Sequence, residues 1–231
     1  MFKKIWKIFL KIVLWYFILS ISTVIIYRFA PPPVTPLMML RCMEQSADKN
    51  RKVKLFKKWQ PLHRISPSLP LAVITAEDQK FEDHFGFDLE AIEKAQQFNE
   101  RHRGKKVKGA STISQQTAKN VFLWSSRSWI RKGFEVYFTF LIEIFWSKER
   151  IMEVYLNVIE MGDGIYGAEA ASLTYFNKPA SKLSNSESAL IAACLPNPLK
   201  WSPAKPTSYI RKKQRWILRH ISYREIRDSK Y

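Results

Sequence analysis

A long apolar segment opens the chain and differs from everything that follows it. Residues 12–27 contain no charged side chain, and the residues before them carry four lysines and no acid. A run of this length is slightly shorter than the roughly 20 residues that cross a bilayer core. Lys11 and Arg28 lengthen the span because their charged ends can reach the headgroups. We therefore predict a transmembrane helix over residues 9–29, after a basic cytoplasmic segment, residues 1–8.

Two other interpretations of this segment compete with the anchor. A cleaved signal peptide needs small residues at its cut site, and residues 27–33 offer no A-x-A site. A buried core helix is the second alternative. Because positively charged flanks tend to stay inside, an uncleaved anchor places the rest of the chain on the outer side of the membrane.

Residues 30–59 are interpreted as a linker. Its prolines, Pro31, Pro32, Pro33 and Pro36, predict a stiff and extended spacer. Residues 49–58 are strongly basic, with apolar residues between the charges. Such a run is either a solvated charged face or, close to a bilayer, a contact with anionic lipid.

Helical spacing dominates from Ser68 onward, and alternating strand patterns are nearly absent. Ser68 is a predicted N-cap, and apolar Leu89, Ile92 and Phe98 are candidates for the buried side of the second helix. The predicted helices run from Ser68 to Gly86, from a cap at Asp88, over Thr112–Phe122, over Ser128–Phe145, from Ser147, over Ser184–Leu195 and over Thr207–Arg224. We predict a mainly α domain over residues 60–205, with one small hairpin of unassigned position, and a basic C-terminal helix within residues 206–231.

The excess of basic residues indicates that the chain binds an anionic partner. The formal charge is +18, and 34 basic residues still face 20 acidic ones once the four N-terminal lysines are set aside. This excess suits nucleic acid, an anionic membrane surface or a pyrophosphate substrate. Two cysteines do not form a disulfide framework, and Cys194 lies in an apolar segment that predicts a buried thiol.

Residues 77–86 place four carboxylates and one histidine within ten positions. On a continuous helix, Glu77 would share a face with Phe81 and with Lys80. Apolar neighbours such as Ile74 and Phe81 would partly desolvate Glu77, which raises the pKa of a carboxyl group towards that of a useful base. The alternative is a polar helix end that enters a turn at Gly86.

Residues 109–120 combine a glycine, a run of hydroxyl residues and the start of a helix. Free backbone N–H groups at such a start suit an anion. Gln115 and Lys119 lie one turn apart and can line a single face. A capped surface helix is the competing interpretation.

Residues 124–135 place three cations, Arg127, Arg131 and Lys132, ahead of an acid. Arg127, Arg131 and Glu135 recur every four residues. They form either an Arg–Glu pair on a solvent face or a phosphate clamp beside a second acid.

These segments, in this order, resemble the family 51 glycosyltransferases. The family patterns EDxxFxxHxG, G(G/A)STIxQQxxKN, RKxxE and KxxIxExYLN match residues 77–86, 109–120, 131–135 and 148–157. A fifth region begins at residue 162, and the similarity covers about residues 60–205. We expect a monofunctional member, since the chain reaches only Tyr231 and holds no SxxK, SxN and KTG set.

The resemblance implies a lysozyme-like α-helical fold and a polymerising reaction. The 4-hydroxyl of lipid II attacks the anomeric carbon of a growing lipid-linked glycan, undecaprenyl pyrophosphate leaves, and a β-1,4 bond forms with inversion. The expected location is the bacterial inner membrane, with the domain in the periplasm. Partners are these lipid-linked glycans and the membrane, with other cell-wall synthesis proteins as further candidates and no nucleic acid.

The resemblance also implies roles for particular residues. Glu77 matches the general base, and Glu135 matches a second acid that orients cations, helps hold a metal or assists departure. Substrate-binding residues would be Ser111, Thr112, Gln115, Gln116, Lys119, Asn120, Arg127, Arg131 and Lys132, supported by Asp78, Phe81, His84 and Gly86. No cofactor is required, although a divalent cation, Mg²⁺ or Mn²⁺, could bind at the pyrophosphate site.

Two rival functions remain open at this stage. A lysozyme-like hydrolase also uses carboxylates in a helical fold, but it needs no cation set because no pyrophosphate leaves. A membrane-tethered polyanion binder would use the basic C-terminal stretch. That stretch equally suits docking at an anionic bilayer, because apolar residues such as Trp216 and Ile217 are interspersed.

Overall fold

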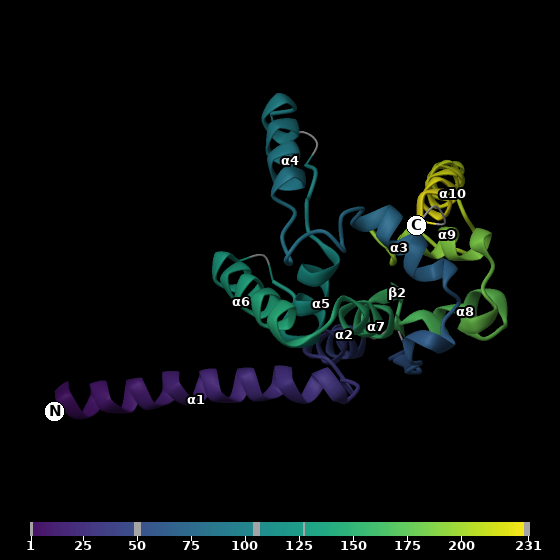
Figure 1. Cartoon of the computed structure of the whole chain (residues 1–231). Coiled ribbons are helices and arrows are strands. Elements are labelled where there is room, and N and C mark those ends of the chain that lie inside the picture. The colour runs from purple at the N-terminus through teal and green to yellow at the C-terminus, as the bar shows by residue number, and fades with distance from the viewer. Residues whose placement is uncertain (1, 49–51, 104–106, 127, 229–231) are drawn as a thin grey trace.

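The structure is a computed structural model that describes residues 2–48, 52–103, 107–126 and 128–228, with side chains described as far as Ile221. It is mainly helical (Figure 1). The helices are α1 Phe2–Phe29, α2 Pro36–Ala47, α3 Ser68–Glu77, α4 Leu89–Arg101, α5 Ile113–Phe122, α6 Trp129–Phe145, α7 Lys148–Val158, α8 Ala168–Phe176, α9 Asn185–Cys194 and α10 Ser208–Asp228, with 3-10 turns at Leu62–Arg64 and Ala180–Lys182.

The predicted small hairpin lies directly after α7. Strands β2 (Glu160–Gly162) and β3 (Ile165–Tyr166) pair antiparallel, and β1 (Phe56–Lys57) adds to β3 in parallel, so the order is β1-β3-β2. Gly164 turns the hairpin with φ +69°. The strands are too short for alternation to show in the sequence.

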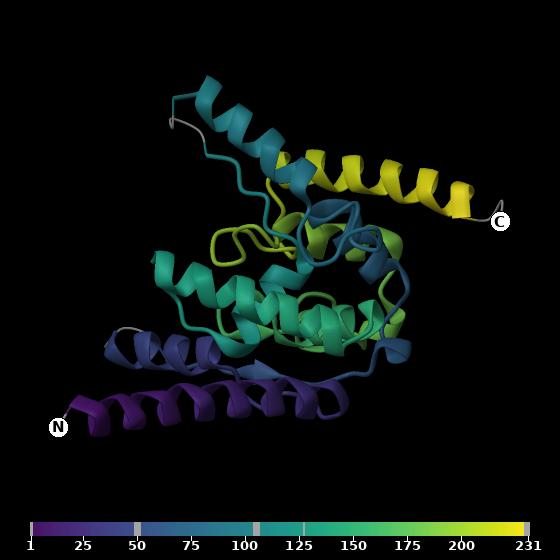
Figure 2. The same ribbon diagram turned by 60° about the vertical axis from the view of Figure 1, so that its left-hand side comes forward.

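Two groups of helices meet at the centre of the domain. Helix α5 packs against α6 and α7, while α3 packs against α9 and α10, and Figure 2 shows these groups one above the other. Fully buried side chains that include Tyr155, Ile113 and Leu69 join them into one core. The C-terminal end of α3 is thereby held beside α5, which positions the site described below.

The apolar N-terminal segment is a helix that docks on the domain. Among the described residues, α1 alone is long and apolar enough to cross a membrane, and it begins at Phe2, before the predicted residue 9. Ser20 Oγ lies 2.7 Å from Tyr137 Oη on α6, and Trp146 Nε1 donates to the Val24 carbonyl at 2.8 Å. Val24 is fully buried. The helix fits a single-pass membrane anchor whose C-terminal half is part of the folded unit.

The predicted helix from Ser68 to Gly86 is wrong in its second half. Helix α3 ends at Glu77, and Asp78 adopts φ −158° and ψ 80°. The Asp78 carboxylate accepts from the Ile113 N–H at 2.9 Å, and this tertiary bond outweighs the local helical spacing. Glu77 and Phe81 therefore do not share a helical face, and Lys80 pairs with Glu90 instead.

The predicted buried side of helix α4 is only partly buried. Leu89 is 75% exposed and Ile92 is 38% exposed, whereas Phe98 is half-buried and Ala95, which lies between Ile92 and Phe98 on the same face, is buried. Figures 1 and 2 show the reason, because α4 projects away from the helical body. Apolar spacing alone does not distinguish a helix that packs from one that projects.

The predicted extended spacer and the Ser68 cap are also corrected. Pro36 begins helix α2, a position where proline is tolerated because its missing N–H needs no partner, and Thr35 caps the helix through the Met38 N–H. Ser68 is the first residue of α3 rather than its cap, and its hydroxyl lies 2.7 Å from Ser188 Oγ. The predicted caps Asp88, Ser147 and Ser184 are confirmed.

The turn after α3 gives the first prediction. Gly86 has φ +78°, and an added Cβ would lie 2.8 Å from Thr139 Cγ2. We expect Gly86→Ala to lower the free energy of unfolding by about 1–3 kcal/mol, measured by denaturant titration in detergent. Gly133→Ala is the control, since it meets open space within a helix and should stabilise by about 0.5–1 kcal/mol. Equal stability of the two variants would contradict the expectation.

Candidate active site

Glu77 ends helix α3 at the junction of the two helical groups. Its Oε2 accepts from Gln116 Nε2 at 3.0 Å, and Gln116 Oε1 in turn accepts from Tyr155 Oη at 3.3 Å. Burial raises the pKa of Glu77, an effect opposed by the Gln116 hydrogen bond and by the charges of Lys213 and Lys119. The predicted desolvation of Glu77 is confirmed. A carboxylate with a raised pKa and a fixed orientation is suited to accept a proton.

Asp78 and His84 shape the backbone beside this acid. Asp78 is buried and uses its two oxygens separately, one for His84 Nε2 at 2.9 Å and one for the Ile113 N–H at 2.9 Å. It therefore joins the end of α3 to the first turn of α5. The supporting roles expected of Asp78 and His84 stay a prediction, and these contacts are of the kind that such roles require.

A second network of contacts supports the turn after α3, residues 78–86. Phe81 is fully buried, and the Lys148 ammonium lies 4.7 Å from its ring centre. Lys148 also donates to the His84 carbonyl at 2.6 Å and to Glu143 Oε1 at 2.8 Å. The Thr112 hydroxyl donates to the Gly86 carbonyl at 2.7 Å. These contacts hold the turn that carries Asp78 and His84.

The start of α5 is organised by a capping box. Thr112 Oγ1 accepts from the Gln115 N–H, while Gln115 Oε1 accepts from the Thr112 N–H, both at 3.1 Å. Thr112 and Gln115 were predicted to line a substrate site. These polar groups of the two residues instead form hydrogen bonds with each other. Ser111 is exposed and Gln116 is partly buried, so both present side chains to the surface of the site.

The predicted cations gather around Glu135. This buried carboxylate accepts from Arg131 Nη1 at 2.6 Å and from Lys132 Nζ at 2.5 Å. Lys119 lines the same cavity as Arg131; burial lowers the pKa of Lys119, and the charge of Glu135 opposes that shift. Three cations against one acid leave a positive site for an anion. Arg127 lies outside the described residues.

Two cavities meet at Glu77. One, of about 660 Å³, runs over Ser111, Thr112 and Gln116 towards helices α4 and α10. The other, of about 520 Å³, runs over Lys119, Asn120 and Arg131 towards α2 and β2. Glu77, Ser111 and Gln116 line both. Two substrates can therefore reach one carboxylate from two cavities. Both contain cations, which are Lys80, Lys94, Lys108 and Lys213 in the first and Arg41, Lys119 and Arg131 in the second. Gln115 and Lys132 instead line a neighbouring cavity.

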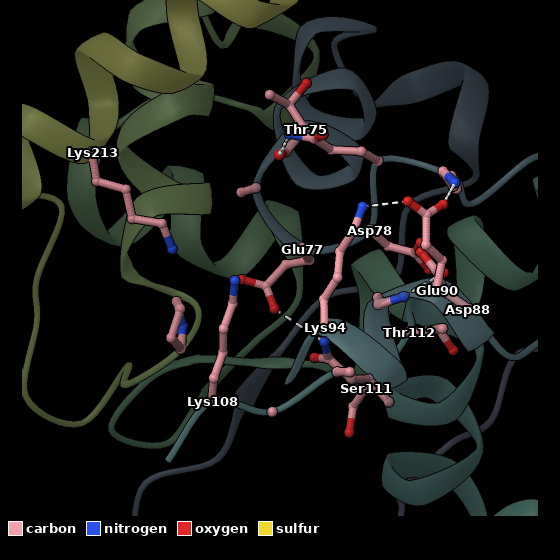
Figure 3. Close-up of a pocket in the computed structure, with 18 of the residues that line it drawn as sticks. Thr75, Glu77, Asp78, Asp88, Glu90, Lys94, Lys108, Ser111, Thr112 and Lys213 are labelled. Atoms are coloured by element: carbon pink, nitrogen blue, oxygen red, sulfur yellow. Dashed lines mark hydrogen bonds and ion pairs between the residues drawn. The ribbon is translucent and has the colours of Figure 1, made fainter. Parts of the chain in front are cut away.

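Lys213 on α10 was missed as a site residue. It lines the cavity of about 660 Å³ and points towards Glu77 (Figure 3). Burial lowers the pKa of Lys213, and the charge of Glu77 opposes this. The sequence interpretation assigned the whole basic stretch to membrane docking or polyanion binding. The sequence contained a signal for this position, because Ile210, Gln214 and Ile217 recur at helical spacing. All three are buried in the structure, and Lys213 lies beside the face that they form.

The geometry suits group transfer better than simple anion binding. A partly buried acid that can take a proton faces cations that can stabilise a departing anion, and a separate cavity admits a second molecule. The fold and the site together define a transferase.

Comparison with known proteins agrees with this class. The family described as Transglycosylase matches residues 45–222. A biosynthetic peptidoglycan transglycosylase of Bacteroides thetaiotaomicron is 56% identical over 217 residues, 94% of this chain and 86% of the relative. Those of Bdellovibrio bacteriovorus and Caulobacter vibrioides are 52% and 55% identical, covering 94% and 85% of this chain and 85% and 82% of the relatives.

The chain belongs to the transglycosylase family. Three expectations are thereby confirmed: the resemblance to family 51 glycosyltransferases, the mainly α, lysozyme-like fold, and the enzyme class, a peptidoglycan glycosyltransferase of cell-wall synthesis. The matched region begins before residue 60 and ends after residue 205, the predicted bounds of the domain. It includes the last residues of α2 and most of α10.

The Gln116 contact predicts a pH effect. Glu77 is the expected general base, which acts when ionised, so we expect activity to fall as pH drops through the raised pKa of Glu77. Removing the hydrogen bond that favours the ionised form raises this pKa further. We expect Gln116→Leu to move the acidic limb of the rate profile to higher pH, measured as initial rates of polymer formation. Tyr155→Phe keeps the Gln116 donor and should leave the limb in place. A shift to lower pH in Gln116→Leu would contradict this.

Proposed function

We propose that the chain polymerises lipid II into β-1,4 glycan strands and releases undecaprenyl pyrophosphate. The observation that supports this most directly is the pair of cavities that share Glu77, one of which contains Lys119 and Arg131 and the other Lys213. The acceptor lipid II would occupy the cavity of about 660 Å³. The growing lipid-linked glycan would occupy the cavity that contains Lys119.

The proposed chemistry is a single displacement. Glu77 takes the proton of the acceptor's 4-hydroxyl as its oxygen attacks the anomeric carbon of the donor. The bond between that carbon and the pyrophosphate oxygen breaks, and its electron pair leaves with undecaprenyl pyrophosphate. Attack on the face opposite the leaving group converts an α-linked donor into a β product. The hydrogen bond from Gln116 keeps the accepting oxygen oriented.

The leaving group determines what the other cavity must supply. Pyrophosphate departs as an anion, so cationic stabilisation matters more than a strong acid. Lys119 and Arg127 would contact it, with Arg131 and Lys132 in support. Glu135 would act by positioning, because it holds Arg131 and Lys132 through charged hydrogen bonds.

The membrane supplies both substrates in this proposal. Helix α1 would cross the bacterial inner membrane once, with its lysine-rich start in the cytoplasm and the domain in the periplasm. Apolar side chains of α6, including Trp129, Ile130 and Phe140, are exposed on the helix against which α1 packs. An exposed apolar face beside an anchor suits contact with lipid.

Purified lipid II tests the function directly. Full-length protein in detergent should convert it into long glycan that lysozyme digests, with release of undecaprenyl pyrophosphate. A hydrolase would instead shorten preformed glycan and leave lipid II intact, and either result in place of polymer would refute the proposal. Duplex nucleic acid bound more tightly than anionic liposomes would favour the polyanion binder.

A divalent cation fits this site poorly as a protein-held metal. Both oxygens of Glu135 are paired with cations, and among the described residues no group of three or more His, Cys, Asp or Glu side chains could hold a metal ion. We propose that Mg²⁺ or Mn²⁺, where it contributes, is bound mainly by substrate oxygens. Chelator should lower the polymerisation rate by about tenfold or less, and complete loss would contradict this.

A further inference from the structure

Helix α2, which the sequence placed in a linker, forms part of the cavity that contains Lys119. Leu37 and Arg41 of α2 line it together with Glu160 of β2. Met38, one residue after Leu37, is fully buried and fixes α2 against the core. This end of the cavity lies outside every motif that suggested the function, so its side chains have no assigned task.

Arg41 and Glu160 form a long ion pair at this end, and Glu160 Oε1 also accepts from Tyr166 Oη at 3.4 Å. Arg41 Nη1 lies 2.7 Å from Glu44 Oε2, and Arg41 Nε lies 3.4 Å from Glu160 Oε2. Although Arg41 Nε is buried, it has no hydrogen-bond partner among the described residues. A buried donor without a partner is uncommon and costs free energy.

The local charge excludes a second phosphate site. Arg41 is flanked by two carboxylates, Glu44 and Glu160, so the group has no positive excess. Lys119 and Arg131, in contrast, belong to a cluster with three cations and one acid. An anionic group should therefore bind at the Lys119 end, and the Arg41 end suits a neutral ligand that both donates and accepts hydrogen bonds.

The apolar surface beside the pair suits a sugar ring. Leu37, Leu195, Pro196 and Pro198 line the same cavity. Binding sites of this kind combine an apolar lining with a few polar groups that fix orientation. The C–H faces of a pyranose can pack on such a surface while its hydroxyls reach the guanidinium and the carboxylate.

We propose that Arg41 and Glu160 form a saccharide subsite that binds a sugar unit of the growing glycan, away from the pyrophosphate. The identity of the ligand rests on the proposed function, in which the cavity binds a growing glycan. It would strengthen binding of donors that are long enough to reach it, and so favour continued extension of one strand over the start of new ones.

Product length tests the subsite. We expect Arg41→Ala and Glu160→Gln to shorten the mean glycan about three- to tenfold, the range that one or two net hydrogen bonds give. Strands would be separated on gels after lipid II polymerisation. The initial rate of joining two lipid II molecules should change less, by about twofold, because a disaccharide donor does not reach the subsite. Wild-type product length in both variants would overturn the proposal.

A matched variant separates binding from helix packing. Glu44→Gln removes the partner of Arg41 on α2 but leaves the guanidinium at the cavity, so it should retain wild-type product length. Equal shortening in Glu44→Gln and Arg41→Ala, with equal falls in thermal midpoint, would show a structural role and overturn the proposal. Arg64→Ala, on an exposed turn, controls for charge.

Binding distinguishes this inference from the proposed function. A soluble tetrasaccharide of alternating N-acetylglucosamine and N-acetylmuramic acid would be titrated into the full-length protein by calorimetry. Weaker binding to Arg41→Ala, by about three- to tenfold, supports the subsite even if lipid II is not polymerised. Equal binding by wild type and Arg41→Ala rejects the subsite even if polymerisation is observed.

Discussion

Replacing Glu77 with glutamine is expected to reduce lipid II polymerisation by about 10²–10⁴-fold, the contribution typical of a general base. Glutamine keeps an oxygen that can accept from Gln116 Nε2, so the side chain should stay in place. What it loses is the ability to take a proton. Initial rates with purified lipid II, at saturating substrate, measure the loss.

The folded state should tolerate this change. The pKa of Glu77 is raised on folding, so the ionised group destabilises the native state at pH values above that pKa. A neutral glutamine removes this effect, and the thermal midpoint should stay level or rise. Glu149→Gln, in the exposed first turn of α7, is the control with full activity. A Glu77→Gln enzyme within tenfold of wild type would exclude Glu77 as the base.

Lys119→Met is expected to produce the second large loss, about 10²–10³-fold in rate. Removing one preorganised charge or donor from a developing anion typically costs this much. Burial lowers the pKa of Lys119, which means that its charge is held in place at a cost to the fold. Methionine keeps the length and apolar stem of the side chain while it removes the charge.

The pattern of kinetic change distinguishes catalysis from binding. Loss of an interaction made mainly in the transition state lowers kcat, whereas loss of uniform binding raises KM alone. We expect the effect of Lys119→Met to fall mainly on kcat. Lys182→Met, on an exposed turn, should match wild type. A raised KM with unchanged kcat would reassign Lys119 to substrate binding.

Much of the helical structure could be predicted because its signals are local. Asp88, Ser147 and Ser184 cap helices through their own side chains, and Ser128 does the same for α6. A cap is made by residues three apart in sequence, so it is visible without the fold. The order of the motifs, likewise a local property, was enough to indicate the family.

The errors concern contacts between distant segments. Asp78 leaves the helix because it bonds to Ile113, 35 residues later. Lys213 reaches Glu77 only because α10 packs against α3 and α9. Arg41 enters the cavity because Pro36 begins a helix that the proline-rich sequence was taken to exclude. In each case tertiary packing outweighs the local signal.

The docked C-terminal half of α1 limits how the enzyme can search for its substrate. Trp146 and Arg150 bond to the carbonyls of Val24 and Tyr27, so the domain does not swing on a tether. With α1 across a bilayer, Glu77 stays at a constant height above the lipid plane. Encounters with the lipid-linked substrates proposed above would then occur by lateral diffusion in two dimensions, and the rate should follow the surface density of substrate in the membrane rather than its bulk concentration.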